Sequence, residues 1–169
     1  MTTDAHDFAP WVDQHREQLW RAAWLLTGDA HRADDLVQTA LLKAWPRWDR
    51  ITSRGEPEAY VRRILYTTYL AWWRRRWTGE VPTAVLPDAA SRAVTPVDDD
   101  AVDLAAALAR LSRGQRAVVV ARFFDDLSVA ETARRLAVSE GTVKSQTARA
   151  LAALRSSPHL AGSQTGGKE

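Results

Sequence analysis

A basic helical face near the C-terminal end is the part of the sequence whose residues most clearly suit a chemical task. The apolar spacing predicts a helix over about 140–154, with Ser139 as its N-cap. Winding it at about 100° per residue separates an apolar stripe from a face of cations, hydroxyls and small side chains, free of acids beyond the first turn. Such a face suits the major groove of duplex DNA, where Arg and Lys bind guanine and phosphate, although an ordinary solvated face is the alternative. The candidate contacts are Thr142, Lys144, Ser145, Gln146, Ala148 and Arg149.

The residues before this helix predict the first half of a helix-turn-helix. Ser128 and Glu131 have the spacing of a capping box at the start of a helix over 129–136. A four-residue break over 137–140 then separates the two helices, which is the spacing typical of this motif. We therefore expect the second helix to be the one that enters the groove.

A predicted helix over 57–77 carries aromatic and arginine side chains on the face opposite its apolar stripe. Exposed rings are unusual unless something covers them. Rings interleaved with arginine suit unpaired nucleic acid, because the cations hold the backbone while the rings stack on bases. Packing of the rings on a linker or on a protein partner is the alternative. The candidate residues are Arg62, Arg63, Tyr66, Tyr69, Trp73, Arg74, Arg75, Arg76 and Trp77.

A third candidate surface is the acidic side of a helix predicted over 31–45. Leu42 lies among polar side chains opposite the apolar stripe, which indicates a protein contact, although a single exposed leucine is common. The polar residues around it are Asp34, Asp35, Gln38 and Thr39.

No group of residues forms a catalytic or metal-binding constellation in the sequence. The chain has no cysteine, and its four histidines are scattered. The acidic pairs are adjacent in sequence and so do not face each other on a helix. We find no Ser-His-Asp motif, P-loop or glycine-rich phosphate loop. We therefore expect a protein that is not an enzyme and that holds no metal and no cofactor.

The elements that carry these surfaces fall into two parts of different composition. All eight tryptophans lie between Trp11 and Trp77. Residues 1–84 are nearly neutral, residues 85–103 hold one basic and five acidic side chains, and residues 104–169 have a net charge of +5. The total of +2 therefore conceals two modules joined by an acidic linker.

Both modules show the helical apolar period and no strand-like alternation. We predict an all-α fold of two small helical domains joined by a flexible acidic linker, with further helices over 8–26, 104–111 and 115–124. The expected domains are 8–78 and 104–156, with a linker over 79–103 and a disordered tail over 157–169. The apolar runs are far shorter than the ~20 residues of a membrane span, and the N-terminus lacks a signal peptide, so we expect a cytoplasmic protein without membrane contact.

These motifs resemble the extracytoplasmic-function (ECF) sigma factors, the smallest members of the sigma-70 family. LLTGDAHRADDLVQTALLKAWPRW is similar to their region 2, YVRRILYTTYLAWWRRRW to their −10 recognition and melting helix, and LSRGQRAVVVARFFDDLSVAETARRLAVSEGTVKSQTARALAALR to their region 4. The match covers roughly residues 8–155. The resemblance implies an alternative sigma factor that directs promoter-specific transcription initiation by −35 duplex readout and −10 strand capture.

The resemblance also implies partners. Asp34, Asp35, Leu36 and Gln38 would bind the β′ clamp helices of core RNA polymerase, and the second module would bind the β flap. The helix over 57–77 would capture the promoter −10 element, and the helix over 140–154 would read the −35 element. An anti-sigma factor is a further expected partner, and the free protein is expected to be monomeric. A stand-alone helix-turn-helix regulator and a protein-binding adaptor stay open as alternatives.

Three residues depart from the family pattern. Thr67 stands where asparagine is common in the melting helix. Ala137 replaces a frequent glycine in the turn, which is tolerated if its φ is not positive. Ser112 replaces a frequent proline. None of the three removes a cation or a ring from either binding face.

Overall fold

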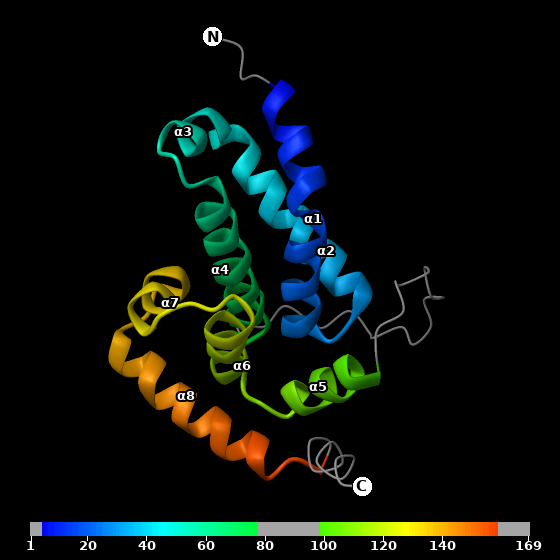
Figure 1. Ribbon diagram of the computed structural model, residues 1–169, viewed down its shortest axis with the longest axis vertical. Helices are drawn as coiled ribbons and strands as arrows, with labels where there is room; N and C mark the ends of the chain where they lie inside the picture. The colour runs from blue at the N-terminus through cyan, green and yellow to red at the C-terminus, as the bar shows by residue number, and fades with distance from the viewer. Residues whose placement is uncertain (1–4, 78–98, 159–169) are drawn as a thin grey trace, which may run out of the picture.

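The computed structural model describes residues 5–77 and 99–158, with side chains over 7–72 and 99–158 (Figure 1). Within these ranges every regular element is a helix, which confirms the all-α prediction. Residues 79–98 of the predicted linker (79–103) and residues 159–169 of the predicted tail (157–169) lie outside the described residues. The N-terminal module contains α1 (Ala5–Thr27), α2 (Ala30–Ala44), the 3₁₀ turn η1 (Trp45–Arg47), α3 (Trp48–Ser53) and α4 (Pro57–Trp77). The C-terminal module contains α5 (Asp99–Ala109), α6 (Arg113–Val119), the π turn η2 (Val120–Phe124), α7 (Val129–Leu136) and α8 (Glu140–Arg155).

The long helices of the N-terminal module pack because each carries an apolar stripe that needs cover. α2 lies between α1 and α4 and contacts both. The turn from α1 to α2 uses Gly28 at φ +70°, a conformation that side chains disfavour. Asp29 then caps α2 by accepting a hydrogen bond from the Arg32 amide at 2.9 Å. The buried residues of α2 are Ala33, Leu36, Val37, Ala40 and Ala44.

Side-chain caps set the helix starts of the C-terminal module. Ser112 and Gln115 form a capping box at α6, so serine starts this helix where proline is frequent in the family. Ser128 and Glu131 form the predicted capping box at α7. Ser139 caps α8 as predicted. α7, the short turn and α8 together make the expected helix-turn-helix.

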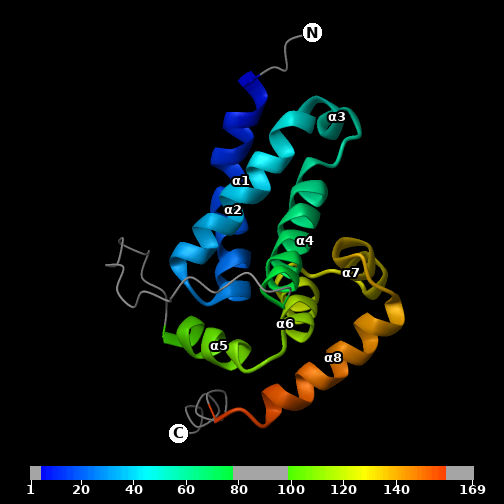
Figure 2. The same cartoon turned by 180° about the vertical axis from the view of Figure 1, so that it is seen from behind.

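The two modules pack directly against each other. Figures 1 and 2 show α7 beside α4. In addition, α6 contacts α1 and α4, and η2 contacts α1. One hydrophobic cluster includes Leu65 of the first module and Val118 of the second. The described part of the chain therefore adopts a closed arrangement with a shared core.

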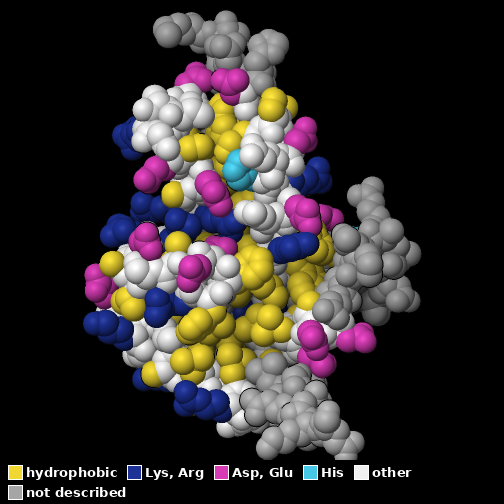
Figure 3. Space-filling view, in the orientation of Figure 1, with side chains coloured by type: hydrophobic (Ala, Val, Ile, Leu, Met, Phe, Trp, Pro, Cys, Tyr) yellow, Lys and Arg dark blue, Asp and Glu magenta, His cyan; other side chains and the backbone are white. Residues whose placement is uncertain are grey.

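The outer surface reflects the difference in composition between the modules. Figure 3 shows hydrophobic side chains gathered at the centre of one face, around α5 and α6, and basic side chains toward the edge where α8 runs. Among the described helices, none has the length and apolar character needed to cross a bilayer.

The helices differ from the predicted ones in three places. α5 begins at Asp99, so residues 99–103 of the predicted linker are helical. α3 occupies residues for which the apolar pattern predicts no helix. It has six residues, too few for a periodic signal, and it is held by the buried side chains of Trp48 and Ile51. The helix predicted over 115–124 is α6 followed by the wider π turn, in which the Asp125 amide donates to the Val120 carbonyl at 3.0 Å.

We expected alanine at position 137 to be tolerated only if its φ is not positive, and in the structure its φ is positive. It ends α7 in the left-handed conformation, at φ 56° and ψ 45°. Its amide donates to the carbonyl of Ala133, so the turn is retained. For a residue with a Cβ this conformation costs roughly 1–2 kcal/mol.

We expect Ala137→Gly to raise the free energy of unfolding by about 0.5–1 kcal/mol, because glycine removes the left-handed strain. Ala152→Gly, at an exposed interior position of α8, is the control and should lower that free energy by about 1 kcal/mol. Urea unfolding followed by circular dichroism measures both. A loss of stability in both variants would contradict the strained turn.

Candidate nucleic-acid interface

The predicted groove-facing side of α8 is open to solvent. Thr142, Lys144, Ser145 and Arg149 are all exposed, as is Ala148, and Ser139 holds the start of the helix by accepting from the Thr142 amide at 3.1 Å. The opposite side is buried through Val143 and Ala150. A cationic face on the second helix of a helix-turn-helix, with nothing of the described chain over it, has the form that major-groove binding requires.

Gln146 differs from the other predicted contacts of α8. Its side chain packs toward α6, where a Cβ on Gly114 would lie 3.2 Å from its Nε2 atom. Its Oε1 atom is buried and has no hydrogen-bond partner. Gln146 therefore joins α8 to α6 in this structure instead of lying on the groove-facing side.

The acidic side of α2 is exposed around Leu42, which has 72% of its surface accessible to solvent. Asp35 and Gln38 are also exposed, and Asp34 and Thr39 are half-buried. Leu36 is fully buried in the core, so a direct contact of its side chain with a partner, which the resemblance implied, does not fit this structure. The residue supports the helix from within.

A shallow apolar pocket adjoins Leu42. Its volume is about 540 Å³, and its walls include Phe8 from α1 and Trp45 after α2. The ring of Phe8 lies 4.9 Å from that of Trp45. Sequence reasoning assigned neither ring to a binding surface, because the pocket forms only where two helices meet.

The α4 face that we predicted to be free is covered by the C-terminal module. Tyr66 is fully buried, and Arg62 and Tyr69 are 6% and 3% accessible. Arg63 alone among the predicted residues before Trp73 is exposed. The prediction of an open face is thus wrong for Arg62, Tyr66 and Tyr69 in the closed arrangement, because the C-terminal module packs over them.

The remaining residues of α4 that the sequence singled out are Thr67 and those over 73–77. The Thr67 hydroxyl donates to the carbonyl of Arg63 at 2.8 Å, so it is engaged with its own helix. The predicted side chains Trp73, Arg74, Arg75, Arg76 and Trp77 lie outside the described residues.

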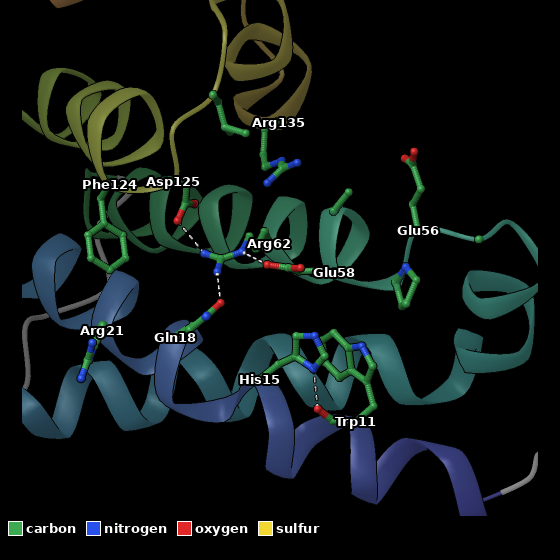
Figure 4. A pocket seen from close by; sticks show the side chains of 14 residues that line it. Trp11, His15, Gln18, Arg21, Glu56, Glu58, Arg62, Phe124, Asp125 and Arg135 are labelled. Atoms are coloured by element: carbon green, nitrogen blue, oxygen red, sulfur yellow. Dashed lines mark hydrogen bonds and ion pairs between the residues drawn. The ribbon is translucent and has the colours of Figure 1, made fainter.

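A buried carboxylate joins the two modules (Figure 4). Asp125, which follows η2, accepts from Arg62 Nη1 at 2.6 Å through Oδ1 and from the Tyr66 hydroxyl at 2.7 Å through Oδ2. The side chain of Asp125 is only 3% accessible and that of Arg62 only 7%. No local sequence pattern marks the role of Asp125.

The N-terminal module fixes Arg62 in place for this contact. Its Nε atom donates to Glu58 Oε1 at 3.0 Å, and its Nη2 atom donates to Gln18 Oε1 at 3.3 Å. Figure 4 shows Arg62 between these two partners and Asp125. All three guanidinium nitrogens are therefore engaged, which makes Arg62 a preorganised anion donor.

Burial shifts the pKa values of Tyr66 and Asp125 at this contact between the modules. It raises the pKa of Tyr66 well above the usual value, and the charge of Asp125 acts in the same direction. Burial also raises the pKa of Asp125, while the Arg62 charge opposes that rise. Tyr66 thus stays protonated and donates. Removing one member of such a group leaves the others buried without a partner, which costs more than the intact pair contributes.

A second arginine, from the C-terminal module, donates to the N-terminal module. Arg116 of α6 donates through Nε to the carbonyl of Leu25, in the last turn of α1. The position is favourable for a cation, because the end of a helix carries partial negative charge. Burial lowers the pKa of Arg116. Its Nη2 atom would lie 3.3 Å from a Cβ at Gly28, so Gly28 also leaves room for this contact.

A cavity of about 750 Å³ runs along the joint between the modules (Figure 4). Its walls include Trp11 and His15, whose rings stack at 4.2 Å, with Phe124 and Arg135 on the other side. Over the described residues, His, Asp and Glu side chains nowhere gather in threes as a metal site would need.

The fold and these surfaces define a helical DNA-binding protein with a second, aromatic-rich module. Comparison with known families narrows this class: residues 11–78 match sigma-70 region 2, and residues 101–154 match sigma-70 region 4. The chain therefore belongs to the sigma-70 family, and it is an alternative sigma factor of the ECF type.

Individual relatives agree with this assignment. The chain is 42% identical to the RNA polymerase sigma-E factor of Streptomyces avermitilis, over 88% of this chain and 83% of that protein. It is 33% identical to the ECF RNA polymerase sigma factor SigL of Mycobacterium tuberculosis, over 85% of this chain and 84% of that protein. A region 2 match over residues 11–78 disfavours the alternative of a stand-alone regulator.

Solved structures show the same architecture. The sigma factor RpoE, in complex with the anti-sigma factor NepR from Bartonella quintana, is similar with a TM-score of 0.70 and 25% identity, covering 88% of this chain and 94% of that one. CnrH, in complex with the cytosolic domain of CnrY, shares the fold with a TM-score of 0.65 and 22% identity, covering 96% and 92%.

The raised pKa of Tyr66 predicts a loss of stability at alkaline pH. The folded protein holds this proton more tightly than the unfolded chain, so the stabilisation is complete below the unfolded pKa of about 10 and is lost as pH rises from that value through the higher folded pKa. The charged groups around the hydroxyl are Asp125, Arg62 and, from α7, Arg135. We expect the urea midpoint to fall less steeply above about pH 9 in Tyr66→Phe than in the unaltered protein.

Tyr60→Phe, at a half-buried position of the same helix, is the matched control. It should keep the slope of the unaltered protein, because Tyr60 lies outside the Asp125 contact. Equal slopes in all three proteins would show that the Tyr66 proton is not coupled to folding.

Proposed function

We propose that this chain binds core RNA polymerase in the cytoplasm and directs it to specific promoters, while the polymerase supplies all of the catalysis. The exposed cationic face of α8 is the observation that carries the proposal. We infer that Thr142, Lys144, Ser145, Ala148 and Arg149 contact the −35 element as duplex. Gln146 would act through the packing of α8 on α6.

We infer that the polymerase is bound through the exposed side of α2. Leu42 would insert into the β′ clamp helices, with Asp35 and Gln38 as polar contacts beside it. The apolar pocket formed by Phe8 and Trp45 extends the same surface. An exposed leucine next to an apolar pocket, with acids around it, supports a protein contact with a basic partner. The β flap would bind the C-terminal module.

Capture of the −10 element is assigned to α4. The predicted residues Arg62, Tyr66 and Tyr69 are covered in the closed arrangement, so this function requires the modules to separate. α8 is exposed before that separation. Duplex binding would thus precede capture of the open strand, since Arg62, Tyr66 and Tyr69 would be covered in the free, monomeric protein.

An anti-sigma factor is a further proposed partner. RpoE and CnrH, the two similar solved structures, are each in complex with another protein, which is named an anti-sigma factor in the case of RpoE. The same kind of partner would suit the apolar surface around Leu42, because covering it would exclude the polymerase.

Transcription in vitro with core polymerase and a library of promoters tests the proposal. Arg149→Ala should reduce initiation and weaken duplex binding by about 1–3 kcal/mol, because a base or phosphate contact is lost. Leu42→Glu should abolish initiation at every promoter and leave duplex binding by α8 unchanged. The two variants therefore separate DNA readout from polymerase binding.

Arg50→Ala, at an exposed position of α3, is the control for loss of one positive charge and should transcribe normally. Absence of initiation from any promoter with the unaltered protein would contradict the proposed function. Equal duplex affinity of the Arg149 variant and the control would contradict only the assignment of α8.

A further inference from the structure

The contact that closes the two modules is built like an anion site. Arg62 and Tyr66 belong to α4, one helical turn apart, and both donate to a single carboxylate. The distances are 2.6 Å from Arg62 Nη1 to Asp125 Oδ1 and 2.7 Å from the Tyr66 hydroxyl to Asp125 Oδ2. Asp125 comes from the other module, 63 residues away from Arg62 along the chain. The donors and the acceptor thus part when the modules separate.

The donor side of this site does not depend on Asp125 for its position. Glu58 and Gln18, both in the N-terminal module, hold Arg62 Nε and Nη2. Nη1 remains as the donor that points to the C-terminal module. Opening therefore leaves a guanidinium and a phenol hydroxyl in place, directed to the same point and without an acceptor.

A phosphate is the anion that matches these donors in the protein's proposed setting. Carboxylate and phosphate both accept charge-assisted hydrogen bonds from an arginine fork, and phosphate offers more oxygens over the same span. The exposed side chain of Arg63 adds a positive charge on the same helix. Arg135, which also acts on Asp125 in the closed form, belongs to α7 and leaves with it.

We propose that Arg62 and Tyr66 form a backbone-phosphate site for unpaired DNA, and that Asp125 occupies this site as an intramolecular substitute in the closed form. The inference rests on the proposed function, because it assumes that α4 meets an open strand. Closure of the modules and binding of the strand are then mutually exclusive. A tethered carboxylate has a high effective concentration, so the closed form resists single strands until the modules separate.

Binding of a fluorescent oligothymidylate to the full-length chain tests the inference, since this strand has phosphates and no promoter sequence. Asp125→Asn removes the charge that competes and should tighten binding by about tenfold. Asp126→Asn is the matched control: it changes the net charge equally at the neighbouring residue, which is exposed at φ 53°. It should leave the affinity within about twofold of the unaltered protein.

Second-site variants identify the donor. Adding Arg62→Gln to Asp125→Asn should remove the gain, whereas adding Arg63→Gln should keep most of it. A duplex of the same length should show no such difference between the Asn variants, because α8 is exposed in either form. Equal affinity of the two Asn variants for the single strand, or a gain that persists without Arg62, would overturn the inference.

Hydrogen exchange of the unaltered protein provides a test that does not depend on the folding of a variant. Saturating oligothymidylate should speed exchange of the amides over 120–127 at least severalfold, because the strand displaces Asp125. Unchanged or slower exchange there would overturn the inference. The proposed function fails independently, through absent initiation with core polymerase, whatever the oligothymidylate results.

Discussion

The buried carboxylate of Asp125 is the constraint on which the closed arrangement depends. An ionised group with 3% of its side chain accessible needs partners for both oxygens. Arg62 and Tyr66 provide them, at 2.6 and 2.7 Å. These contacts place the end of η2 on α4 and, through the following loop, bring α7 beside the same helix. Arg116, which donates to the end of α1, fixes the other side of the joint. Each module therefore gives one arginine to the other, and both arginines lose a hydrogen-bond acceptor when the modules separate.

This arrangement leaves α8 and α4, the two proposed DNA-binding helices, exposed to different degrees. α8 keeps its cationic face exposed, whereas the middle of α4 lies under the C-terminal module. The apolar surface at Leu42 is on α2 and is free in the closed form. The proposed polymerase and duplex surfaces are therefore accessible in the closed form, whereas exposure of Arg62 and Tyr66 requires the two modules to separate.

The helices and their caps could be predicted because they rest on local patterns. Ser128 with Glu131 and Ser139 mark helix starts within a few residues, and the stripe of α2 has the helical period. The contact between the two modules could not be predicted, because Arg62 and Asp125 are far apart in sequence and neither has an unusual neighbour. α4 was ambiguous for a physical reason: it buries two faces, so a prediction that allows one apolar stripe leaves Tyr66 on the solvent side. Ala137 shows the converse, because the tight turn that ends α7 holds it in a left-handed conformation against the preference of the residue.

A distance measurement between the modules tests the closed arrangement most directly. The chain has no cysteine, so the exposed positions Asp49 of α3 and Ala153 of α8 can be replaced by cysteine and spin-labelled without other reactive thiols. Pulsed electron resonance on the free protein should give one narrow distance distribution, and adding core polymerase and promoter DNA should replace it with a clearly shifted one. A free protein that already shows the distribution of the promoter complex would contradict the account.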